Sequence, residues 1–562
     1  MIVGIDLGTT NSLVAYFKEG EPHIIPNRLG KNLTPSVVSI DEEGQVFVGE
    51  TAKERMALYP DTCASVFKRS MGSEKKFRLS GRQYTAEELS SFVLRALKED
   101  AEEFLKEEVT EAVISVPAYF NDARRRATKR AGELAGFKVE RIISEPTAAA
   151  VAYGLYQNKE NSKFLVFDLG GGTFDVSILE LYNKILEVSA VAGDNYLGGE
   201  DFTGVIEDLF FKKYSEIDRL SLSEKETNYI HKQADNCKLG FEEARESKMV
   251  VNLREKTYEF VLDIDTYEEE LQELFDKIRG PIKRSLSDSG LKLNQISKVV
   301  LIGGGTKLSL VRKFVGKLFR SMPDTSINPD EAVALGAAVQ AAMKERNEDI
   351  KEVVLTDVCP FTLGTEVVVD REDGRTEGGH FCPIIERNTV IPASRTERLY
   401  TAHDNQTQIR VNILQGESRF AVNNVSLGKL FIDVPKAKAG EEAVDVTYTY
   451  DVNSILEIIV KVVSNSKEVR QVIRDQENNM TDEEVEERLK ELSYLKIHPR
   501  DKEENKLLLL KGERLYEESI GQDRLLIEQA LRKFEVALDS QDNTKINKAK
   551  EEFKEFLEDF CE

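Results

Sequence analysis

Three glycine-rich turns, each placed after a short apolar stretch, contain the residue types that bind phosphate groups. They are Asp6-Leu7-Gly8-Thr9-Thr10-Asn11, Asp168-Leu169-Gly170-Gly171-Gly172-Thr173-Phe174-Asp175 and Gly303-Gly304-Gly305-Thr306-Lys307. Glycine allows backbone N–H groups to approach phosphate oxygens closely. One such turn is weak evidence, but an Asp-x-Gly turn with a following threonine occurs twice. This recurrence predicts two related halves whose hairpins face one another across a cleft.

An aspartate begins each of the first two turns and is a candidate metal ligand. Mg²⁺ is a hard cation that keeps several water ligands and takes carboxylate oxygens well. A single aspartate at such a position is most simply a cap for its turn. Because Asp6 and Asp168 occupy matching places in two turns, we expect them to hold a hydrated Mg²⁺.

The segments around these turns predict an α/β domain over residues 1–348. Short apolar runs that each precede a turn or a helical pattern are Ala112 to Val116, Phe164 to Phe167 and Val299 to Ile302. Helices are expected over Glu87 to Phe104, Asn121 to Ala135 and Glu331 to Glu345. Alternation of strands and helices is typical of α/β folds.

The pattern of charged and apolar residues changes after this domain. Residues 349–356 form a candidate linker, with a charged start followed by the apolar run Val353-Val354-Leu355. From residue 357 to 480 we expect a β-sandwich domain, because apolar and polar residues alternate with a period of two and glycine and proline punctuate them. Ile409, Val411 and Ile413 show this alternation.

Residues 481–562 predict a helical region. Thr481 with Glu484 matches a capping box, and apolar residues follow at helical spacing. Further amphipathic helices are expected over Asp523 to Leu538 and Asn543 to Phe560, whose apolar stripes are most simply the seam of a helical bundle.

Composition excludes several classes of protein. The 562 residues carry a net charge of -23, which argues against nucleic acid as the main partner and against docking on anionic membranes. The five cysteines contain no CxxC pair, so we expect a reducing, cytoplasmic location rather than a disulfide framework. The first residues read as a strand and not as a signal peptide. No apolar run approaches the ~20 residues of a membrane span.

The turns have the pattern of the sugar kinase/heat-shock/actin superfamily, and further segments narrow the match. The chain resembles the seventy-kilodalton heat-shock chaperone family of the DnaK type up to about residue 480. The segments that carry the resemblance are Val116-Pro117-Ala118-Tyr119-Phe120-Asn121-Asp122, Glu145-Pro146-Thr147-Ala148-Ala149-Ala150, Leu197-Gly198-Gly199-Glu200-Asp201-Phe202, Asn328-Pro329-Asp330-Glu331-Ala332-Val333, Asp404-Asn405-Gln406 and Leu414-Gln415-Gly416-Glu417. The short chain and the abbreviated segment from Ser73 to Tyr84 look most like the HscC branch.

This resemblance implies an actin-like ATPase domain that binds ATP or ADP with Mg²⁺, a peptide-clamping sandwich and a helical lid. Residues that match the two phosphate loops are Gly8, Thr9, Thr10, Asn11, Gly171, Gly172 and Thr173. Residues that match the surroundings of the attacking water and γ-phosphate are Lys68, Glu145, Thr173 and Asp175. Residues that match the adenosine site are Asp235, Lys238, Gly304, Gly305, Lys307 and Asp330.

The adenosine site departs from the family pattern. Leu239 and Lys307 stand where arginine commonly flanks the adenine, Asp235 replaces the usual glutamate and Glu242 the usual serine. A guanidinium stacks on an aromatic plane better than lysine or leucine does. We therefore expect ADP to leave quickly, without a dedicated exchange factor.

The resemblance also implies a polypeptide groove in the sandwich and a docking role for the linker. The expected groove residues are Val367, Val368, Leu399, Ala402, Ile409 and Val411. Pattern alone would make them ordinary sandwich core. Thr365 stands where an aliphatic residue is usual in the groove, and Thr356 stands where one is usual in the linker. The linker Val353-Val354-Leu355 is expected to dock on the ATPase domain when ATP is bound.

The resulting hypothesis is an ATP-driven chaperone that binds unfolded or extended polypeptides and works with a J-domain partner. A small-molecule kinase or a filament-forming ATPase could share the actin-like fold. Neither needs the linker and sandwich of residues 353 to 480. A nucleotide-sensing adaptor without refolding activity is the third alternative, kept open by the altered adenosine positions and the short helical tail.

Overall fold

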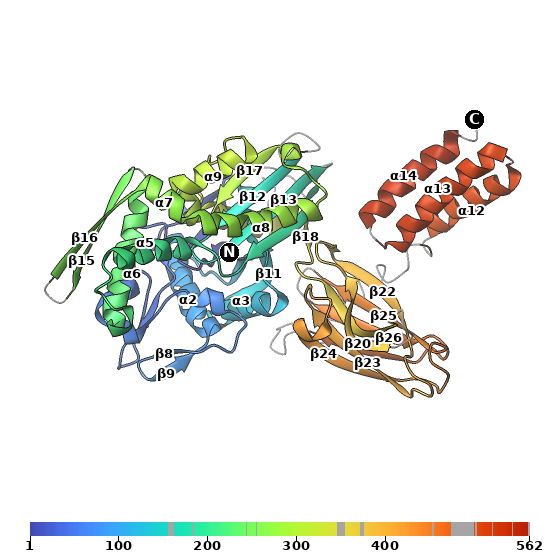
Figure 1. The fold of residues 1–562 in the computed structure, drawn as a ribbon, viewed down its shortest axis with the longest axis horizontal. Coiled ribbons are helices and arrows are strands. Elements are labelled where there is room, and N and C mark those ends of the chain that lie inside the picture. The colour runs from blue at the N-terminus through green and yellow to red at the C-terminus, as the bar shows by residue number, and fades with distance from the viewer. Residues whose placement is uncertain are drawn as a thin grey trace. The chain divides into compact units, whose positions relative to one another are not determined.

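The computed structural model divides the chain into two units, Met1–Pro360 and Phe361–Glu562, by the density of internal contacts. Each unit is described by itself (Figure 1). The structure describes residues 1–154, 162–182, 185–242, 244–253, 256–345, 354–370, 376–451, 455–473, 500, 503–519, 521–541 and 543–559. Among the helices in these ranges, none is long and apolar enough to cross a membrane.

Two mixed sheets form the centre of the first unit. One has the order β11-β10-β1-β2-β3, from β1 (Ile2–Asp6), β2 (Asn11–Lys18), β3 (Glu21–Ile25), β10 (Glu111–Val116) and β11 (Lys138–Ser144), and β4 (Thr34–Pro35) pairs with β2. The other has the order β17-β12-β13-β14-β18, from β12 (Ser162–Leu169), β13 (Phe174–Tyr182), β14 (Ile185–Asp194), β17 (Lys298–Ile302) and β18 (Val354–Val358).

The two sheets repeat one plan. In each, the strand that enters a phosphate turn pairs antiparallel with the strand that leaves it, as β1 does with β2 and β12 with β13. In each, the entering strand also pairs in parallel with a later strand, β10 or β17. Asp6 and Asp168 therefore stand at equivalent strand ends, which is the internal repeat that the sequence predicted.

Two alanine-rich helices, α4 (Glu145–Ala152) and α10 (Ala332–Lys344), pack closely against each other, and α10 also packs against β1. A methyl group on Gly336 would collide with the backbone of Ala148, and one on Gly4 would collide with the backbone of Ala338. Small residues on these elements let their backbones approach. This packing places Glu145, the first residue of α4, next to the carboxyl end of β1.

The remaining helices of this unit cover the sheets and flank the cleft. They are α1 (Glu50–Leu58), α2 (Ala86–Leu105), α3 (Asp122–Leu134), α5 (Gly199–Lys213), α6 (Glu224–Gly240), α7 (Ile264–Glu270), α8 (Gln272–Asp288) and α9 (Ser309–Phe319). Small peripheral sheets are formed by β5 (Val38–Ile40), β6 (Val46–Val48) and β7 (Cys63–Ala64), by β8 (Phe77–Leu79) and β9 (Arg82–Tyr84), and by β15 (Glu246–Leu253) and β16 (Lys256–Asp263). The helices predicted at 87–104, 121–135 and 331–345 are confirmed to within a residue or two at each end.

Among the described residues, the second unit contains two four-stranded sheets and three α-helices. One sheet has the order β20-β19-β23-β24, from β19 (Leu363–Asp370), β20 (Thr376–Ile385), β23 (Gln408–Gln415) and β24 (Val425–Asp433). The other has the order β22-β25-β26-β27, from β22 (Ala393–Tyr400), β25 (Ala443–Tyr450), β26 (Leu456–Val462) and β27 (Glu468–Ile473). A two-residue strand, β21 (Val390–Ile391), precedes β22.

The helices of this unit are α12 (Glu503–Glu518), α13 (Gly521–Asp539) and α14 (Asn543–Asp559). Phe534 and Leu538 of α13 pack with Ile546 and Phe553 of α14 in one buried cluster, which is the seam expected from the apolar stripes. The fold class predicted from the sequence, an α/β domain followed by sheets and then helices, is confirmed. The capping box at Thr481 lies outside the described residues.

Candidate nucleotide site

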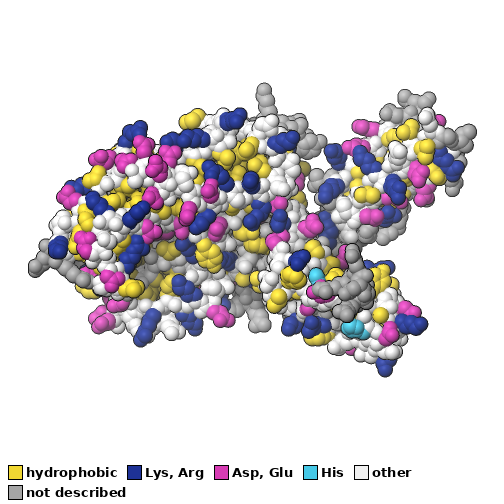
Figure 2. All heavy atoms as spheres, in the orientation of Figure 1, with side chains coloured by type: hydrophobic (Ala, Val, Ile, Leu, Met, Phe, Trp, Pro, Cys, Tyr) yellow, Lys and Arg dark blue, Asp and Glu magenta, His cyan; other side chains and the backbone are white. Residues whose placement is uncertain are grey.

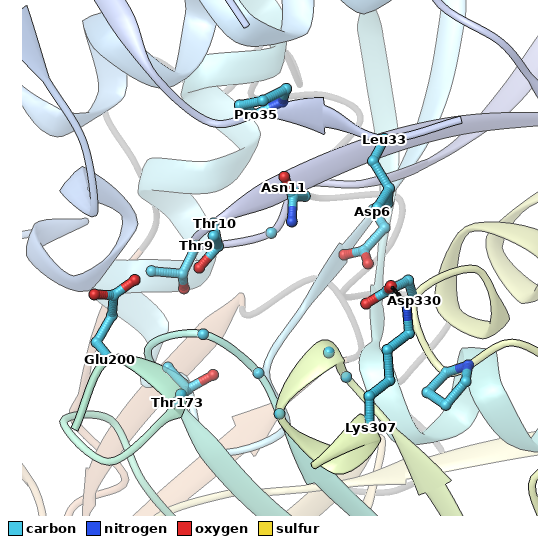
Figure 3. Close-up of a pocket in the computed structure, with 18 of the residues that line it drawn as sticks. Asp6, Thr9, Thr10, Asn11, Leu33, Pro35, Thr173, Glu200, Lys307 and Asp330 are labelled. Carbon is cyan, nitrogen blue, oxygen red and sulfur yellow. Dashed lines mark ion pairs between the residues drawn. The ribbon is translucent and has the colours of Figure 1, made fainter. Parts of the chain in front are cut away.

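The first unit contains a cleft of about 430 Å³, the size of a small-molecule site. Most of the residues expected at the nucleotide line it: Asp6, Gly8, Thr9, Thr10, Asn11, Lys68, Glu145, Asp168, Gly171, Thr173, Asp235, Lys238, Gly304, Gly305, Lys307 and Asp330. The other two expected residues, Gly172 and Asp175, lie directly beside these residues but do not line the cleft. Figure 3 shows side chains from both halves of the unit pointing into this space.

The two phosphate turns meet at their tips. A methyl group on Gly171 would collide with the side chain of Thr10, and one on Gly172 would collide with Thr9. In Figure 3, Thr9 and Thr10 lie opposite Thr173. Glycine is therefore required in the second turn for the hairpins to face each other, and backbone N–H groups of both turns are within reach of the same ligand.

Four carboxylates and one lysine cluster at the base of this cleft and directly beneath it. Lys68, Glu145, Asp168 and Asp175 are buried, and Asp6 is partly buried. Lys68 of the short helix Phe67–Ser70 places its Nζ 2.9 Å from Glu145 Oε1, and both side chains are less than a tenth exposed. Burial, reinforced by the Glu145 carboxylate, raises the pKa of Asp6 to about 7, even though Ser115 donates a hydrogen bond to its Oδ1. Burial and the charge of Glu145 also raise the pKa values of Asp168 and Asp175 well above their usual range.

This cluster fits a cation that keeps its own water ligands. Asp168 Oδ2 is buried and has no hydrogen-bond partner among the described residues. In the described part of the chain, no group of three or more His, Cys, Asp or Glu side chains is arranged to hold a metal ion by itself. Mg²⁺ typically takes one or two carboxylates plus waters and substrate phosphates. Asp6 and Asp168 are the donors that this structure offers for such a hydrated ion.

Arg69 ties the two halves of the unit together beside the phosphate turns. Its Nε donates to the carbonyl of Gly172 at 2.8 Å, and its Nη2 lies 3.1 Å from Asp201 Oδ2. Asp201 also accepts from the backbone N–H of Gly198, at the start of α5. Sequence reasoning did not identify Arg69 as a site residue; its place next to Lys68 was the available signal.

Helices α5 and α6 form the end of the cleft where the sequence predicted the adenosine. Lys238 Nζ lies 2.7 Å from Asp235 Oδ1 and donates to Thr203 Oγ1 at 2.7 Å. It also donates to the carbonyl of Gly199 at 3.1 Å. The charge of Lys238 keeps the pKa of Asp235 below its usual value despite burial. Asp235 is therefore an anionic acceptor at the wall of the cleft, held in place by its helical neighbour.

The two positions that lack the usual arginine differ in environment. Leu239 lines the cleft and is 48% exposed. Lys307, in the short helix Gly304–Lys307, forms an ion pair with Asp330 across the cleft floor, as Figure 3 shows. Leu239 thus offers an exposed apolar side chain, and the Lys307 ammonium is already engaged by a carboxylate.

The linker adds a strand to the sheet that carries the second phosphate turn. Strand β18 pairs in parallel with β14, with Val354 opposite Ile185 and Leu355 opposite Leu186. Asp357, near the end of this strand, lies 3.7 Å from Arg125 Nη1 of α3. Arg125 is buried and also donates to the carbonyls of Ala118 and Phe120. Val353 lies outside the described residues.

The residues expected in the polypeptide groove occupy the second unit. Val367 lies on β19, Ile409 and Val411 on β23, and Leu399 on β22, while Ala402 follows β22. Ile409 and Val411 are buried, Val367, Leu399 and Ala402 are partly exposed, and Val368 is 43% exposed. The solvent exposure of these six side chains therefore ranges from buried to exposed.

The first unit thus places two facing phosphate turns around one cleft, and a linker strand, a unit of two sheets and helices follow it in the chain. The family model described as Hsp70 protein matches residues 2–560. The chain belongs to the Hsp70 family. It is accordingly an ATPase and an ATP-dependent chaperone that binds polypeptides. The family binds ATP and ADP, typically with Mg²⁺.

Proposed function

We propose that nucleotide bound in the cleft controls the grip of the second unit on polypeptide through strand β18. The observation that carries this proposal is the parallel pairing of β18 with β14. Strand β14 also pairs along its whole length with β13, which begins at the second phosphate turn. A change at that turn therefore has a short, hydrogen-bonded route to the strand that leads into the second unit.

The contacts of Asp357 give this docked strand a polar anchor. Its partner Arg125 is held by two backbone carbonyls, so the guanidinium stays in position when the strand leaves. Asp357 is also close enough to Arg141 of β11 to interact with it electrostatically. Thr356, in contrast, disfavours docking of the strand, because its Oγ1 is buried without a hydrogen-bond partner among the described residues. A buried orphan hydroxyl disfavours docking by roughly 1–3 kcal/mol.

In the cleft, we assign Lys68, Glu145, Thr173 and Asp175 to the hydrolysis step. Lys68, Glu145 and Thr173 line the cleft and Asp175 is buried beside them, which supports orientation of a water and neutralisation of charge on the γ-phosphate. Asp6 and Asp168 would hold hydrated Mg²⁺, which supplies charge stabilisation to the phosphates when bound. Asp235 and Lys238 would meet the ribose and base, and the backbones of Gly304 and Gly305 would approach the adenosine.

In the second unit, we propose that an extended polypeptide segment binds in a groove lined by Val367, Val368, Leu399, Ala402, Ile409 and Val411. Extended segments bind through main-chain hydrogen bonds, with pockets for alternate side chains. The mixture of buried and partly exposed apolar residues on β19, β22 and β23 supports a groove with a packed floor and open walls. The helices α12–α14 are the proposed lid.

Finer features of the proposal rest on residues that distinguish this chain. The short segment from Ser73 to Tyr84, which folds into the β8–β9 hairpin region, supports placement in the HscC branch. Leu239 and the engaged Lys307 support rapid ADP release without a dedicated exchange factor. A J-domain partner and a cytoplasmic location complete the proposal. The four cysteines in the described part of the chain form no disulfide, in keeping with that location.

The direct test measures release of a labelled polypeptide from the full chain. ATP should accelerate release from the parent, and Asp357→Asn should abolish most of the acceleration while leaving ATP binding intact. Asn retains the shape of Asp but loses the charge that faces Arg125. Equal acceleration in the variant and the parent would refute the role of β18.

A further inference from the structure

A buried threonine without a hydrogen-bond partner lies on the sheet proposed to hold polypeptide. Thr365 of β19 is 0% exposed, and its Oγ1 makes no hydrogen bond with any of the described residues. Buried polar side chains usually have partners, and an orphan hydroxyl is costly. A valine has the same shape and would avoid that cost, so this hydroxyl needs a functional explanation.

The register of the strands places Thr365 on the face of the proposed groove. It lies directly opposite Ile413 of β23 in an antiparallel ladder, and opposite residues of such a ladder point to the same face. Ile409 and Val411 share that face with Ile413, because side chains alternate along a strand. Thr365 therefore belongs to the same floor as the two buried groove residues.

Thr365 also stands where the two strands cease to pair. The ladder between β19 and β23 covers only Leu363–Gln415, Gly364–Leu414 and Thr365–Ile413 within the described residues. Beyond this point, β19 still pairs with β20 along its other edge, and β23 still pairs with β24 along its other edge. The orphan hydroxyl thus lies at the end of the shared ladder, and the partly exposed Val367 follows two residues later on the same strand.

The neighbouring sheet shows how this domain satisfies a buried threonine when its role is structural. Thr449 of β25 is 1% exposed, and its Oγ1 lies 2.9 Å from Ser394 Oγ of β22. Thr365 lies opposite Ile413 and Cys382, and its Oγ1 forms no hydrogen bond with either of them. The contrast shows that the described residues satisfy the Thr449 hydroxyl but leave the Thr365 hydroxyl without a hydrogen bond.

We propose that Thr365 makes the floor of the groove a polar subsite that selects extended segments with Ser, Thr or Asn at the bound position. This inference rests on the proposed polypeptide groove. A hydroxyl or amide side chain of the segment exchanges a hydrogen bond with Thr365 Oγ1, whereas a large aliphatic side chain leaves it orphaned. A site built to hydrogen-bond a substrate group rejects analogues that lack the group.

A double-mutant cycle on the full, nucleotide-free chain tests the subsite. The probe is a labelled nine-residue peptide of valine and leucine in which one valine is replaced by threonine at each position in turn. For each protein, the affinity for the threonine peptide is divided by the affinity for the valine peptide. At one position, this ratio should be about three- to tenfold larger for the parent than for Thr365→Val. Valine and threonine have the same shape, so the difference reports the hydroxyl pair alone.

Thr449→Val is the matched control. It removes a hydroxyl that has a partner, so it should lower the thermal midpoint and leave peptide preference unchanged. Thr365→Val should raise the midpoint while it lowers the preference for threonine. The subsite is overturned if parent and Thr365→Val show the same threonine-to-valine ratio at every position. Failure of the folded parent to bind any of these peptides would instead refute the polypeptide groove itself.

Discussion

The strongest single perturbation of the cleft is removal of the Lys68 charge. Lys68 Nζ lies 2.9 Å from Glu145 Oε1, with the two side chains 3% and 9% exposed. Lys68 also offsets the charges of Asp6 and Asp175, whose pKa values it lowers against the effect of burial. Lys68→Met keeps an unbranched side chain, one atom shorter than that of lysine, and leaves these carboxylates without the ammonium charge. Breaking a buried pair by removing one partner costs about 3–5 kcal/mol.

The size of this loss should depend on pH, with a definite sign. Burial raises the pKa of Asp6 from 3.8 to about 7, so the folded protein holds a proton that the unfolded chain releases. The stabilisation from that proton is complete below about pH 4 and is lost as pH rises through about 7. Lys68→Met should therefore lower the thermal midpoint strongly at pH 8 and much less at pH 6, without nucleotide or Mg²⁺. An equal loss at both pH values would refute the charge argument.

The control and the kinetic arm use Glu145→Gln. This variant removes one of the clustered carboxylates, so it should cost less than half the stability lost in Lys68→Met at pH 8. Both variants should slow single-turnover ATP hydrolysis by about 10²–10³-fold, the range for loss of one preorganised charge-stabilising group, with smaller changes in ADP affinity. If stability alone governed the rate, the two variants would differ in hydrolysis as they differ in midpoint.

Three further predictions concern the linker, the groove and nucleotide exchange. Thr356→Val removes the orphan hydroxyl from β18 and should strengthen docking of the strand by about 1–3 kcal/mol. Hydrogen exchange of the Leu355 backbone amide should then slow, and faster exchange would contradict this prediction. Ile409→Phe overfills a position that is only 8% exposed and should weaken binding of apolar peptides to the full chain at least tenfold. The far-ultraviolet circular dichroism spectrum should stay unchanged, and undiminished binding would show that Ile409 is not a groove residue. Leu239→Arg supplies the missing guanidinium plane, worth about 0.5–2 kcal/mol, and should slow release of a fluorescent ADP analogue in stopped flow about three- to thirtyfold; an unchanged rate would discard the stacking argument.

The phosphate turns could be predicted from sequence because their signals are local. A glycine that must let two backbones approach, or an aspartate at the end of a strand, is visible in a few consecutive residues. The duplicated turn also predicted the repeat of the two sheets. The period-two pattern after residue 357 gave two sheets for the same reason, since alternation reports a strand with one buried face.

Contacts between distant segments left no comparable signal. Arg69 reaches Gly172 and Asp201, and Asp357 reaches Arg125, through packing that brings together residues far apart in the chain. The family resemblance implied that the linker at Val354 docks, but not that its partner is strand β14. Surface charge was equally uninformative about the site, because acidic and basic side chains are interspersed on the face seen in Figure 2.

The central claim is that the cleft and the polypeptide groove act on each other. Steady-state ATP hydrolysis by the full chain, measured with and without an unfolded peptide, tests it most directly. Reciprocal coupling requires that a ligand of one site alter events at the other. We predict that the peptide stimulates hydrolysis in the parent and loses this effect in Asp357→Asn. A hydrolysis rate that saturating peptide leaves unchanged in the parent, although the peptide is bound, would contradict the account.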